Sequence, residues 1–334
     1  MKAIWMSDRG QALLDTIYTG ALREKLEAQV QFVSTITSAQ EAQASKEQLK
    51  DVECIFSTWG MLPLSAEQIR ECFPSLKAVF YGAGSVQYFA RPFLQSGVRV
   101  FSSAAANAVP VAEYTLAQIL LAGKGFYQAS RLYKEGQHKK AQEFSKRHTG
   151  NYDAVVGIIG AGMIGKLVIR MLKDYRFRIL CFDPFLPEKA AEELGVKKTG
   201  LQELFAESDV ISNHLANNAQ TVGMLDYGCF SKMNPYATFL NTGRGAQVVE
   251  ADLAQALKEE PGRTAVLDVT WPEPVEEGHE FLSLPNVVLT PHIAGSMSQE
   301  TSRMGDYQIQ EFFAWIEGKE LSLEVTEAML RTMA

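Results

Sequence analysis

Short apolar runs alternate with polar or amphipathic segments along most of the chain, a pattern typical of α/β proteins. Amphipathic segments such as residues 13–29 and 65–73 separate several of the early runs and favour helices. Strands that alternate with helices form parallel sheets covered on both faces. The first hundred residues therefore predict one such sheet, built from KAIWM (2–6), VQFVS (30–34), VECIFST (52–58), LKAVFYG (76–82) and VRVFSS (98–103).

A second series of apolar runs begins at residue 154 and predicts a second sheet. Helical segments again lie between the runs, so we expect two doubly wound sheets rather than one large one. The length of 334 residues is sufficient for two domains. The runs of the second series are AVVGIIG (154–160), RILCFD (178–183), DVISNH (209–214), ATFLNTG (237–243), RTAVLDV (263–269) and NVVLTPH (286–292).

Residues 109–144 connect the two series and show helical spacing. Pro110 lies where a helix can begin, because proline is tolerated in the first helical turn. The segment becomes polar and basic after Arg131, which fits either a solvated helix or an arm that reaches a second subunit. Near the other end of the chain, residues 299–319 predict an amphipathic helix.

A glycine-rich turn follows the run that begins at residue 154. The spacing Gly160-x-Gly162-x-x-Gly165 leads into a helix-like stretch at 166–177, and Asp183 ends the next strand-like run. Glycines of this kind also occur in ordinary turns, but here strand, turn, helix, strand and acid stand in the order that a dinucleotide site requires. Because the charge of Asp183 would repel a 2′-phosphate, we expect NAD rather than NADP.

Composition narrows the class of protein. Hydrophobic residues make up 46% and charged residues 21%, as in globular proteins, and the net charge of −7 argues against nucleic acid or an anionic membrane as a partner. The four cysteines, at 54, 72, 181 and 229, form no CxxC pair and are expected to be reduced core thiols. No signal-peptide core and no long apolar span is seen, so a cytoplasmic location is expected. No spacing of metal ligands is present, so no metal is expected.

Three stretches at predicted strand ends carry residues suited to chemistry on an acid. Arg244 lies between two glycines and offers a fork for a carboxylate, although it is equally compatible with a surface turn. Glu273 lies between two prolines, and a solvated loop acid is its simplest interpretation. His292 follows Pro291 at a strand end, where an isolated histidine is more often structural than catalytic. Together they supply a cation for a carboxylate, a proton donor and an acid that orients the imidazole.

These motifs resemble the D-isomer-specific 2-hydroxyacid dehydrogenase family. The matching stretches are GIIGAGMIG, CFDPF, NTGRGAQVVEADLAQAL, LDVTWPEP and LPNVVLTPHIAGS, in family order and spacing, together with YGAGSV and VAEYTLAQILLA. The resemblance implies two doubly wound parallel-sheet domains. A flavodoxin-like substrate (catalytic) domain would comprise 1–103 plus 297–334, and a Rossmann NAD-binding domain at 104–296 would be inserted into it. Residues 124–150 would form the dimer arm of a homodimer.

The resemblance also implies roles for the reacting residues. Arg244 would clamp the substrate carboxylate and polarise the oxo group. His292 would give a proton to the oxygen as hydride arrives, or remove it in the reverse direction, and Glu273 would hold and charge His292. Ala83 and Gly84 would bind the carboxylate from the other domain through backbone N–H groups.

Cofactor contacts are implied at a larger set of positions. Met163 and Ile164 would cover the pyrophosphate, Asp183 would bind the adenosine ribose, Thr242 would line the nicotinamide, and Asp268 would bind the carboxamide. The complete set is Gly160, Gly162, Met163, Ile164, Gly165, Asp183, Thr242, Gly243, Arg244, Asp268, His292, Ala294 and Gly295.

The chain departs from the family in places that concern the substrate. Residues 214–218 read HLANN where His-x-Pro-Leu-Thr is frequent. The loop STWGMLPLS contains no cation, whereas phosphoglycerate-type relatives have arginines there, so a non-phosphorylated acid with a small or apolar side chain is expected. Alternatively, Trp59, Met61 and Leu62 pack within the domain, and Arg91 or another distant cation serves a phosphate.

The sequence thus predicts an NAD-dependent oxidoreductase that interconverts a D-2-hydroxy acid and its 2-oxo acid. One alternative is a D-3-phosphoglycerate dehydrogenase. An alternative of another class is an NAD-sensing binding protein that resembles transcriptional co-repressors, against which the acidic chain without basic tails argues.

Overall fold

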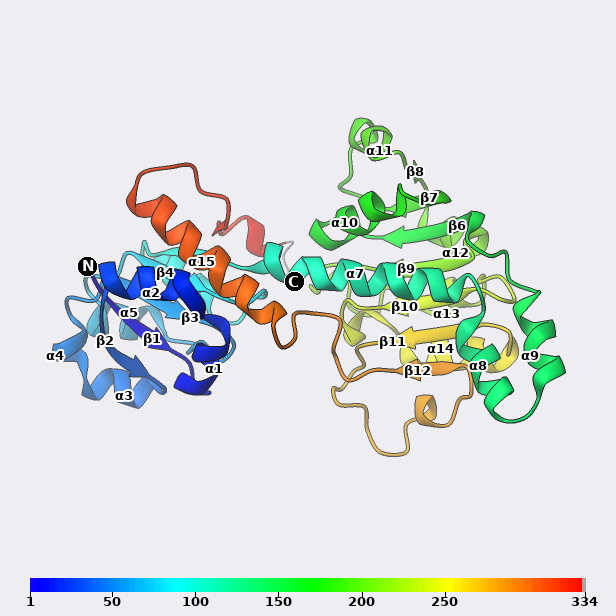
Figure 1. Cartoon of the computed structure of the whole chain (residues 1–334), viewed down its shortest axis with the longest axis horizontal. Coiled ribbons are helices and arrows are strands. Elements are labelled where there is room, and N and C mark those ends of the chain that lie inside the picture. The colour runs from blue at the N-terminus through cyan, green and yellow to red at the C-terminus, as the bar shows by residue number, and fades with distance from the viewer. Residues whose placement is uncertain (332–334) are drawn as a thin grey trace. The chain divides into compact units, whose positions relative to one another are not determined.

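The computed structural model describes residues 1–331, and these residues form two compact units (Figure 1). The first joins residues 1–107 to the described residues from Ser296 onward, and the second comprises residues 108–295. Each unit contains one sheet with helices on both faces, so the predicted α/β fold with two doubly wound sheets is confirmed.

The first unit holds a six-stranded sheet in the order β13-β5-β4-β3-β1-β2. The five long strands are parallel and follow the flavodoxin-like order 2-1-3-4-5, while β13 pairs antiparallel with β5 at the edge. Four of the five predicted runs contain one of these strands, and the run at 30–34 overlaps β2, which continues to Ile36. The strands are β1 (Lys2–Met6), β2 (Gln31–Ile36), β3 (Cys54–Ser57), β4 (Ala78–Tyr81), β5 (Arg99–Ser102) and β13 (Glu324–Val325).

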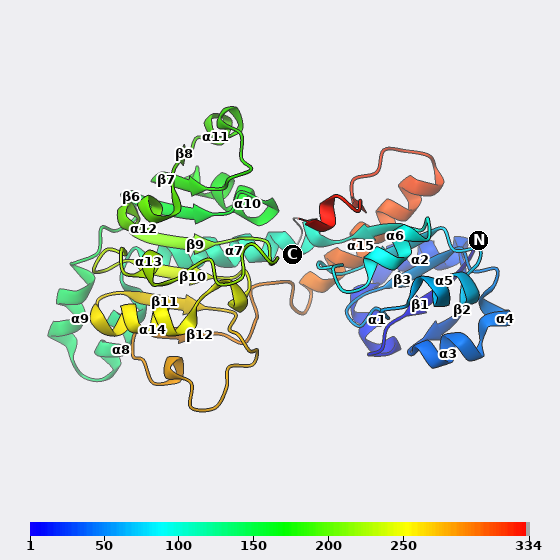
Figure 2. The same ribbon diagram turned by 180° about the vertical axis from the view of Figure 1, so that it is seen from behind.

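Helices cover both faces of this sheet. On one face lie α1 (Gln11–Ile17), α2 (Gly20–Gln29) and α15 (Glu300–Ile316), and on the other lie α3 (Ala39–Ala44), α4 (Lys46–Leu49), α5 (Ala66–Cys72) and α6 (Ala90–Gln95) (Figures 1 and 2). The one-turn helix η3 (Met329–Arg331) follows β13.

Alternating side chains of the central strands build a separate core on each face. Ile55 points into one cluster and Phe56 into the other. Phe56, Phe80 and Phe101 are register partners on three neighbouring strands, and their rings stack at centroid distances of 5.0 Å and 4.8 Å. Phe312 of α15 packs edge-on against Phe56 and Phe80, so the end of the chain completes the core that its beginning starts.

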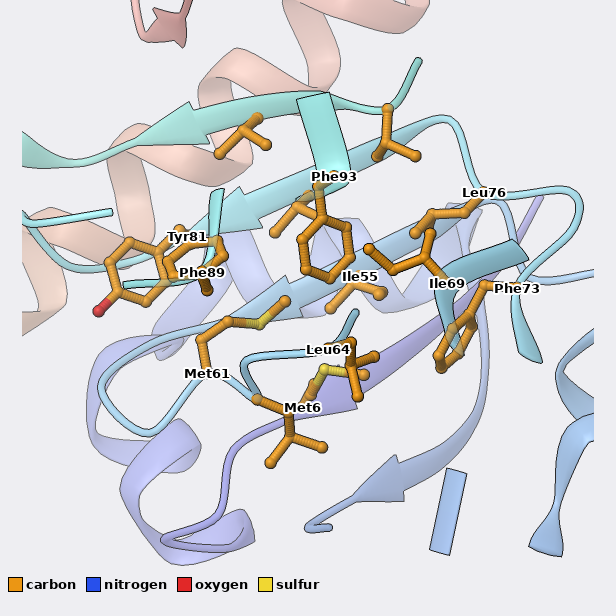
Figure 3. Close-up of a cluster of buried hydrophobic side chains, with 14 of the residues drawn as sticks. Met6, Ile55, Met61, Leu64, Ile69, Phe73, Leu76, Tyr81, Phe89 and Phe93 are labelled. Atoms are coloured by element: carbon orange, nitrogen blue, oxygen red, sulfur yellow. The ribbon is translucent and has the colours of Figure 1, made fainter. Parts of the chain in front are cut away.

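The apolar loop after β3 also belongs to this core. Met61 is buried in the cluster of the α5 face (Figure 3). Leu62 is buried in the same cluster, and Trp59 packs against it. The alternative interpretation of these apolar residues, that they pack within their own domain, therefore fits the structure. The absence of a cation from the loop remains the informative feature for the substrate.

The second unit holds a seven-stranded parallel sheet in the order β12-β11-β10-β9-β6-β7-β8. The six strands β6 to β11 follow the Rossmann order 3-2-1-4-5-6, and β12 extends that edge. The strands are β6 (Tyr152–Ile159), β7 (Arg176–Phe182), β8 (Lys197–Lys198), β9 (Val210–Asn213), β10 (Thr238–Asn241), β11 (Thr264–Leu267) and β12 (Val287–Leu289).

Helices again lie on both faces of the second sheet (Figures 1 and 2). One face carries α7 (Ala104–Ala122), α10 (Met163–Leu172) and α11 (Glu188–Leu194), and the other carries α12 (Leu201–Glu207), α13 (Tyr227–Phe230) and α14 (Glu250–Glu259). The remaining helices of this unit are α8 (Phe126–Lys134), α9 (His138–Ser145), η1 (Gly245–Gln247) and η2 (Glu280–Leu282).

Two predicted helix boundaries were wrong. Helix α7 begins at Ala104 and contains Pro110 in its interior, because the alanine-rich residues before the proline favour the helix. The helix after the glycine-rich turn spans Met163–Leu172 rather than 166–177, because β7 already begins at Arg176. The segment after α7 forms two short helices separated by Gly136, which has a positive φ.

None of the helices within residues 1–331 combines the length and the apolarity that crossing a membrane requires.

Candidate active site

The glycine-rich turn joins β6 to α10, and the absence of a side chain has a different physical consequence at each of its three glycines. Gly160 has a φ of +90°, and a Cβ there would lie 2.7 Å from the carbonyl oxygen of His214. A Cβ on Gly165 would lie 2.0 Å from the carbonyl oxygen of Gly160. The glycine therefore allows the first turn of α10 to lie directly against the backbone at the end of β6. Around Gly162 nothing lies within 4 Å of such a Cβ, so the backbone there is open to a ligand at the start of α10.

Asp183 follows β7 beside this turn. One carboxylate oxygen accepts a hydrogen bond from the N–H of Ala161 at 2.8 Å, and the other accepts one from the N–H of Phe185 at 2.8 Å. The carboxylate is partly exposed and keeps acceptor capacity for further donors. Open backbone at Gly162, the N-terminal turn of α10 and a fixed acid at the next strand end fit a dinucleotide. Met163 and Ile164 form the first residues of that helix, with Met163 exposed.

His292 and Glu273 lie against each other at the same edge of the sheet. Nδ1 of His292 is 2.7 Å from Oε1 of Glu273, and both side chains are about two-fifths exposed, at 43% and 40%. An ionised carboxylate can only accept hydrogen bonds, so Nδ1 carries a hydrogen and Nε2 is the ring atom left for a ligand.

The backbone of His292 is held by Asp268, which follows β11. His292 has a φ of +53°, in the left-handed region, and its N–H donates to the carbonyl oxygen of Asp268 at 3.0 Å. The Asp268 carboxylate is buried and accepts from the hydroxyl of Thr290 at 2.6 Å and from the N–H groups of Ile293 and Ala294, both at 2.9 Å. Asp268 therefore fixes the turn that presents the imidazole.

A second anchor holds the loop that carries Glu273. Oε1 of Glu250, the first residue of α14, accepts from the N–H of Trp271 at 2.9 Å, and its Oε2 lies 3.2 Å from Nε2 of His279. Burial raises the pKa of Glu250 above its usual value. The loop is thus tied to α14 on both sides of Glu273.

Arg244 occupies the turn after β10. Arg244 is partly buried, and its Nη1 donates to the carbonyl oxygen of Gly243 at 2.7 Å. Burial lowers the pKa of Arg244, while the negative charge of Glu273 opposes that shift, which places this carboxylate within electrostatic reach. A Cβ on Gly245 would lie 2.1 Å from the backbone carbonyl carbon of Thr270, so the Arg244 turn packs directly on the loop that leads to Glu273.

The structure therefore brings Arg244, Glu273 and His292 to one place within the second unit. They follow β10, β11 and β12, three neighbouring strands whose carboxyl ends share one edge. Thr242 lies beside them, with its hydroxyl 3.4 Å from that of Thr115 in α7.

Ala83 and Gly84 belong to the first unit, where they follow β4. Ala83 is buried, and the hydroxyl of Ser102 donates to the carbonyl oxygen of Gly84 at 2.6 Å. Arg91, the distant cation considered for a phosphate, pairs with Glu327 at 2.9 Å on the exposed surface. The unit also presents a cation that sequence reasoning missed, because Arg9 in the turn after β1 is exposed and its charge acts on the hydroxyl of Tyr88.

Other polar residues of the second unit also escaped the sequence analysis. Asn213, Asn241 and Gln247 form a buried group beside Arg244. His214, noted only as part of a departure from the family pattern, is buried, and burial lowers its pKa to about 4. The sequence feature that could have revealed the amide group is the asparagine at the end of each of two neighbouring strands, β9 and β10. Among residues 1–331 no group of three or more His, Cys, Asp or Glu side chains is arranged to hold a metal ion.

Comparisons with known proteins agree with this geometry. Residues 116–294 match the family described as D-isomer specific 2-hydroxyacid dehydrogenase, NAD binding domain. The chain is 34% identical over 211 residues to a D-3-phosphoglycerate dehydrogenase of Archaeoglobus fulgidus, a match that spans 63% of this chain but only 40% of that protein. It is 31% identical over 275 residues to a glyoxylate reductase of Korarchaeum cryptofilum, spanning 82% of each.

The fold has solved counterparts as well. The apo form of D-mandelate dehydrogenase from Rhodotorula graminis superposes with a TM-score of 0.83 at 20% identity, covering 98% of this chain and 97% of that one. At this level of identity the likeness concerns the two-domain fold.

Proposed function

Since the chain belongs to the D-isomer-specific 2-hydroxyacid dehydrogenase family, we propose that it transfers a hydride between NAD(H) and a D-2-hydroxy acid/2-oxo acid pair. The observation that carries the proposal is the 2.7 Å contact between His292 and Glu273, with the Arg244 guanidinium beside it and the glycine-rich turn on the same sheet. When bound, the nicotinamide supplies or takes the hydride.

The protein groups perform the proton and charge chemistry. Arg244 binds the substrate carboxylate and polarises the oxo group through its planar fork of N–H donors. His292 holds a proton on Nε2 and gives it to the substrate oxygen in the reduction, or removes it in the oxidation. Glu273 accepts from Nδ1, fixes the ring orientation and stabilises the imidazolium.

We assign NAD as the preferred cofactor. Asp183 carries a negative charge at the position where the ribose hydroxyls would lie, and its two bonds to backbone N–H groups hold it there. A 2′-phosphate would meet that charge. The remaining cofactor contacts are proposed for Thr242, Gly243, Ala294 and Gly295, which lie in the turns after β10 and β12.

For the substrate we propose a non-phosphorylated 2-oxo acid. The loop of residues 57–65 offers no cation, and Arg91 is already paired with Glu327. The backbone of Ala83 and Gly84 is proposed to bind the carboxylate, which gives residues 1–103 plus 297–334 the substrate role and residues 104–296 the NAD role.

A D-3-phosphoglycerate dehydrogenase is the second candidate, favoured by the relative in Archaeoglobus fulgidus and by the exposed Arg9. The two candidates differ in what Arg9 does. If it binds a phosphate, Arg9→Ala raises KM for 3-phosphohydroxypyruvate while KM for pyruvate changes little. A non-phosphorylated substrate predicts poor use of 3-phosphohydroxypyruvate by the wild type.

We further propose a cytoplasmic homodimer with residues 124–150 as the arm. Phe126 and Tyr133 of α8 are 47% and 58% exposed, which suits a face covered by a second copy. All four cysteines are buried and free, which suits a reducing compartment. Sedimentation of the wild type and of a Phe126→Ser, Tyr133→Ser variant tests the dimer.

The experiment that tests the proposed reaction is a panel of 2-oxo acids with NADH, followed by the loss of absorbance and by the chirality of the product. Glyoxylate, pyruvate, 2-oxo-4-methylpentanoate and 3-phosphohydroxypyruvate cover the candidate classes. Tight NADH binding without turnover on any of them would refute the proposal.

A further inference from the structure

Three side-chain amides form a buried cluster beside Arg244. Asn213 ends β9, Asn241 ends β10, and Gln247 ends the short helix that follows Arg244. Their residues are 0%, 1% and 0% exposed, so every polar atom of the cluster needs a partner inside the protein. We call these residues the amide cluster.

The amides satisfy one another. Nδ2 of Asn213 donates to Oδ1 of Asn241 at 3.0 Å and to Oε1 of Gln247 at 2.6 Å. Oδ1 of Asn241 also accepts from the N–H of Gly243 at 3.0 Å. A complete network of this kind is rigid, because releasing one member leaves a buried polar group unpaired.

The same cluster holds both backbone polar groups of Arg244. Oε1 of Gln247 accepts from the N–H of Arg244 at 3.3 Å, and Nδ2 of Asn241 donates to its carbonyl oxygen at 3.2 Å. The guanidinium donates to the carbonyl oxygen of Gly243, whose own N–H the cluster holds. The orientation of the Arg244 side chain thus depends on a backbone fixed by side-chain amides.

The cluster also reaches the loop after β9. The N–H of Leu215 donates to Oδ1 of Asn213 at 3.2 Å, and Nε2 of Gln247 donates to the carbonyl oxygen of Leu215 at 2.8 Å. Two loops at the carboxyl edge of the sheet are therefore joined through Gln247. This explains how the unusual HLANN stretch keeps a fixed beginning without the proline that the family often has there.

Gly243 is the residue that lets the amides approach. A Cβ there would lie 2.9 Å from Oε1 of Gln247 and 3.1 Å from Nδ2 of Asn213. Contacts this short force the cluster to move, although the φ of Gly243 is not positive and alanine suits its backbone.

We propose that Asn213 and Gln247 are positioning residues for Arg244, and that the amide cluster sets the geometry in which the guanidinium meets the substrate carboxylate. The inference rests on the proposed function of Arg244. Asp183 and the His292–Glu273 pair make no hydrogen bond to the cluster, so loss of the cluster disturbs the guanidinium more than it disturbs them.

Gln247→Met tests the proposal, because methionine fills a similar volume without polar atoms. We expect kcat/KM for the best 2-oxo acid to fall about 10- to 100-fold, the scale of a small misplacement of a catalytic group. Affinity for oxamate, a carboxylate that resembles an oxo acid and is not reduced, should fall with it. The Kd for NADH should change far less than oxamate affinity, because the hydrogen bonds of the cluster do not reach Asp183 or the open backbone of Gly162.

Gln308→Met is the matched control. Gln308 is also 0% exposed and donates from Nε2 to the hydroxyl of Ser103 at 2.8 Å, but it lies in α15 of the first unit. A general loss of stability would lower the active fraction of both variants without changing oxamate affinity. If Gln247→Met and Gln308→Met behave alike in oxamate binding and kcat/KM, the proposal is overturned.

If Gln247→Met does not fold, Gly243→Ala tests the positioning role of the amide cluster instead. This variant disturbs the cluster without removing a polar atom. It should weaken oxamate binding in the same direction, and wild-type oxamate affinity in this variant contradicts the inference. Failure of the proposed function is recognised separately, because the wild type itself would then reduce no 2-oxo acid.

Discussion

Asp268 holds His292 in a left-handed backbone conformation by accepting the His292 N–H on its carbonyl oxygen, at 3.0 Å, while its carboxylate accepts from the next two N–H groups. The contact of Asp268 with the carboxamide of the cofactor, which the family resemblance implies, would therefore be a second role beside the structural one. The carboxylate is buried and already has three donors.

Asp268→Asn distinguishes the structural role of Asp268 from a role in cofactor binding. An asparagine must turn its NH2 group toward at least one backbone N–H, which leaves a buried donor unpaired at a cost of about 1–3 kcal/mol. We expect a lower Tm and a lower kcat, measured by thermal denaturation and NADH oxidation. If the residue served only the carboxamide, NADH affinity would fall with no change in Tm.

Arg244→Ala should remove most turnover and leave NADH binding largely intact. The guanidinium contributes charge and a planar fork to the substrate, and losing one such stabilising group typically costs about 10²–10³-fold in rate. The measurements are kcat/KM with the best 2-oxo acid and NADH binding by fluorescence. Arg244→Lys, which keeps the charge without the fork, should recover only part of the loss, and full activity in Arg244→Ala would contradict the carboxylate role.

Asp183 offers a test of cofactor preference with an internal control. Asp183→Asn removes the charge but keeps an oxygen for the N–H of Ala161 or Phe185, whereas Asp183→Ser shortens the side chain and loses those bonds. Both should improve NADPH use relative to NADH by about tenfold or more, as expected for removing a repulsion of order 1–4 kcal/mol. An unchanged NADPH-to-NADH ratio of kcat/KM in both variants would mean that another group enforces the preference.

His214 predicts how stability depends on pH. Burial lowers its pKa from 6.5 to about 4, so between these values the unfolded chain binds more protons than the folded protein. Stability should be complete above about pH 6.5 and should decline as the pH falls toward 4, by up to about 3 kcal/mol from this residue. Thermal denaturation of the wild type and of His214→Gln between pH 7 and 5 checks this, and equal slopes for the two proteins would contradict it.

Much of the site was predictable because its residues either lie close together in the sequence or each follow an apolar strand. The glycine turn, the following helix and Asp183 lie within one βαβ unit, where spacing alone carries the chemistry. Arg244, Glu273 and His292 lie far apart in the sequence, but each follows an apolar strand, and parallel strands bring such residues to one edge.

Other features were not predictable from the sequence for physical reasons. The strands β8 and β13 have two residues each, too few to show an alternating pattern, and β13 pairs with β5, more than two hundred positions away. The amide cluster joins Asn213 to Gln247 across 34 positions, and the asparagines at two strand ends do not by themselves indicate that Gln247 is their partner. Met61 and Leu62 look like pocket residues in the sequence, but they lie in the core.

The contacts of Phe312 and of β13 also constrain how the chain acquires its fold during synthesis. The first unit cannot cover Phe56 and Phe80, or close its sheet edge at β5, until the ribosome has made residues beyond 300. Residues 108–295 precede α15 and β13 in the chain, so they leave the ribosome first and are free to fold as a unit while translation proceeds. The last segments that the first unit needs therefore become available only after the whole of the second unit.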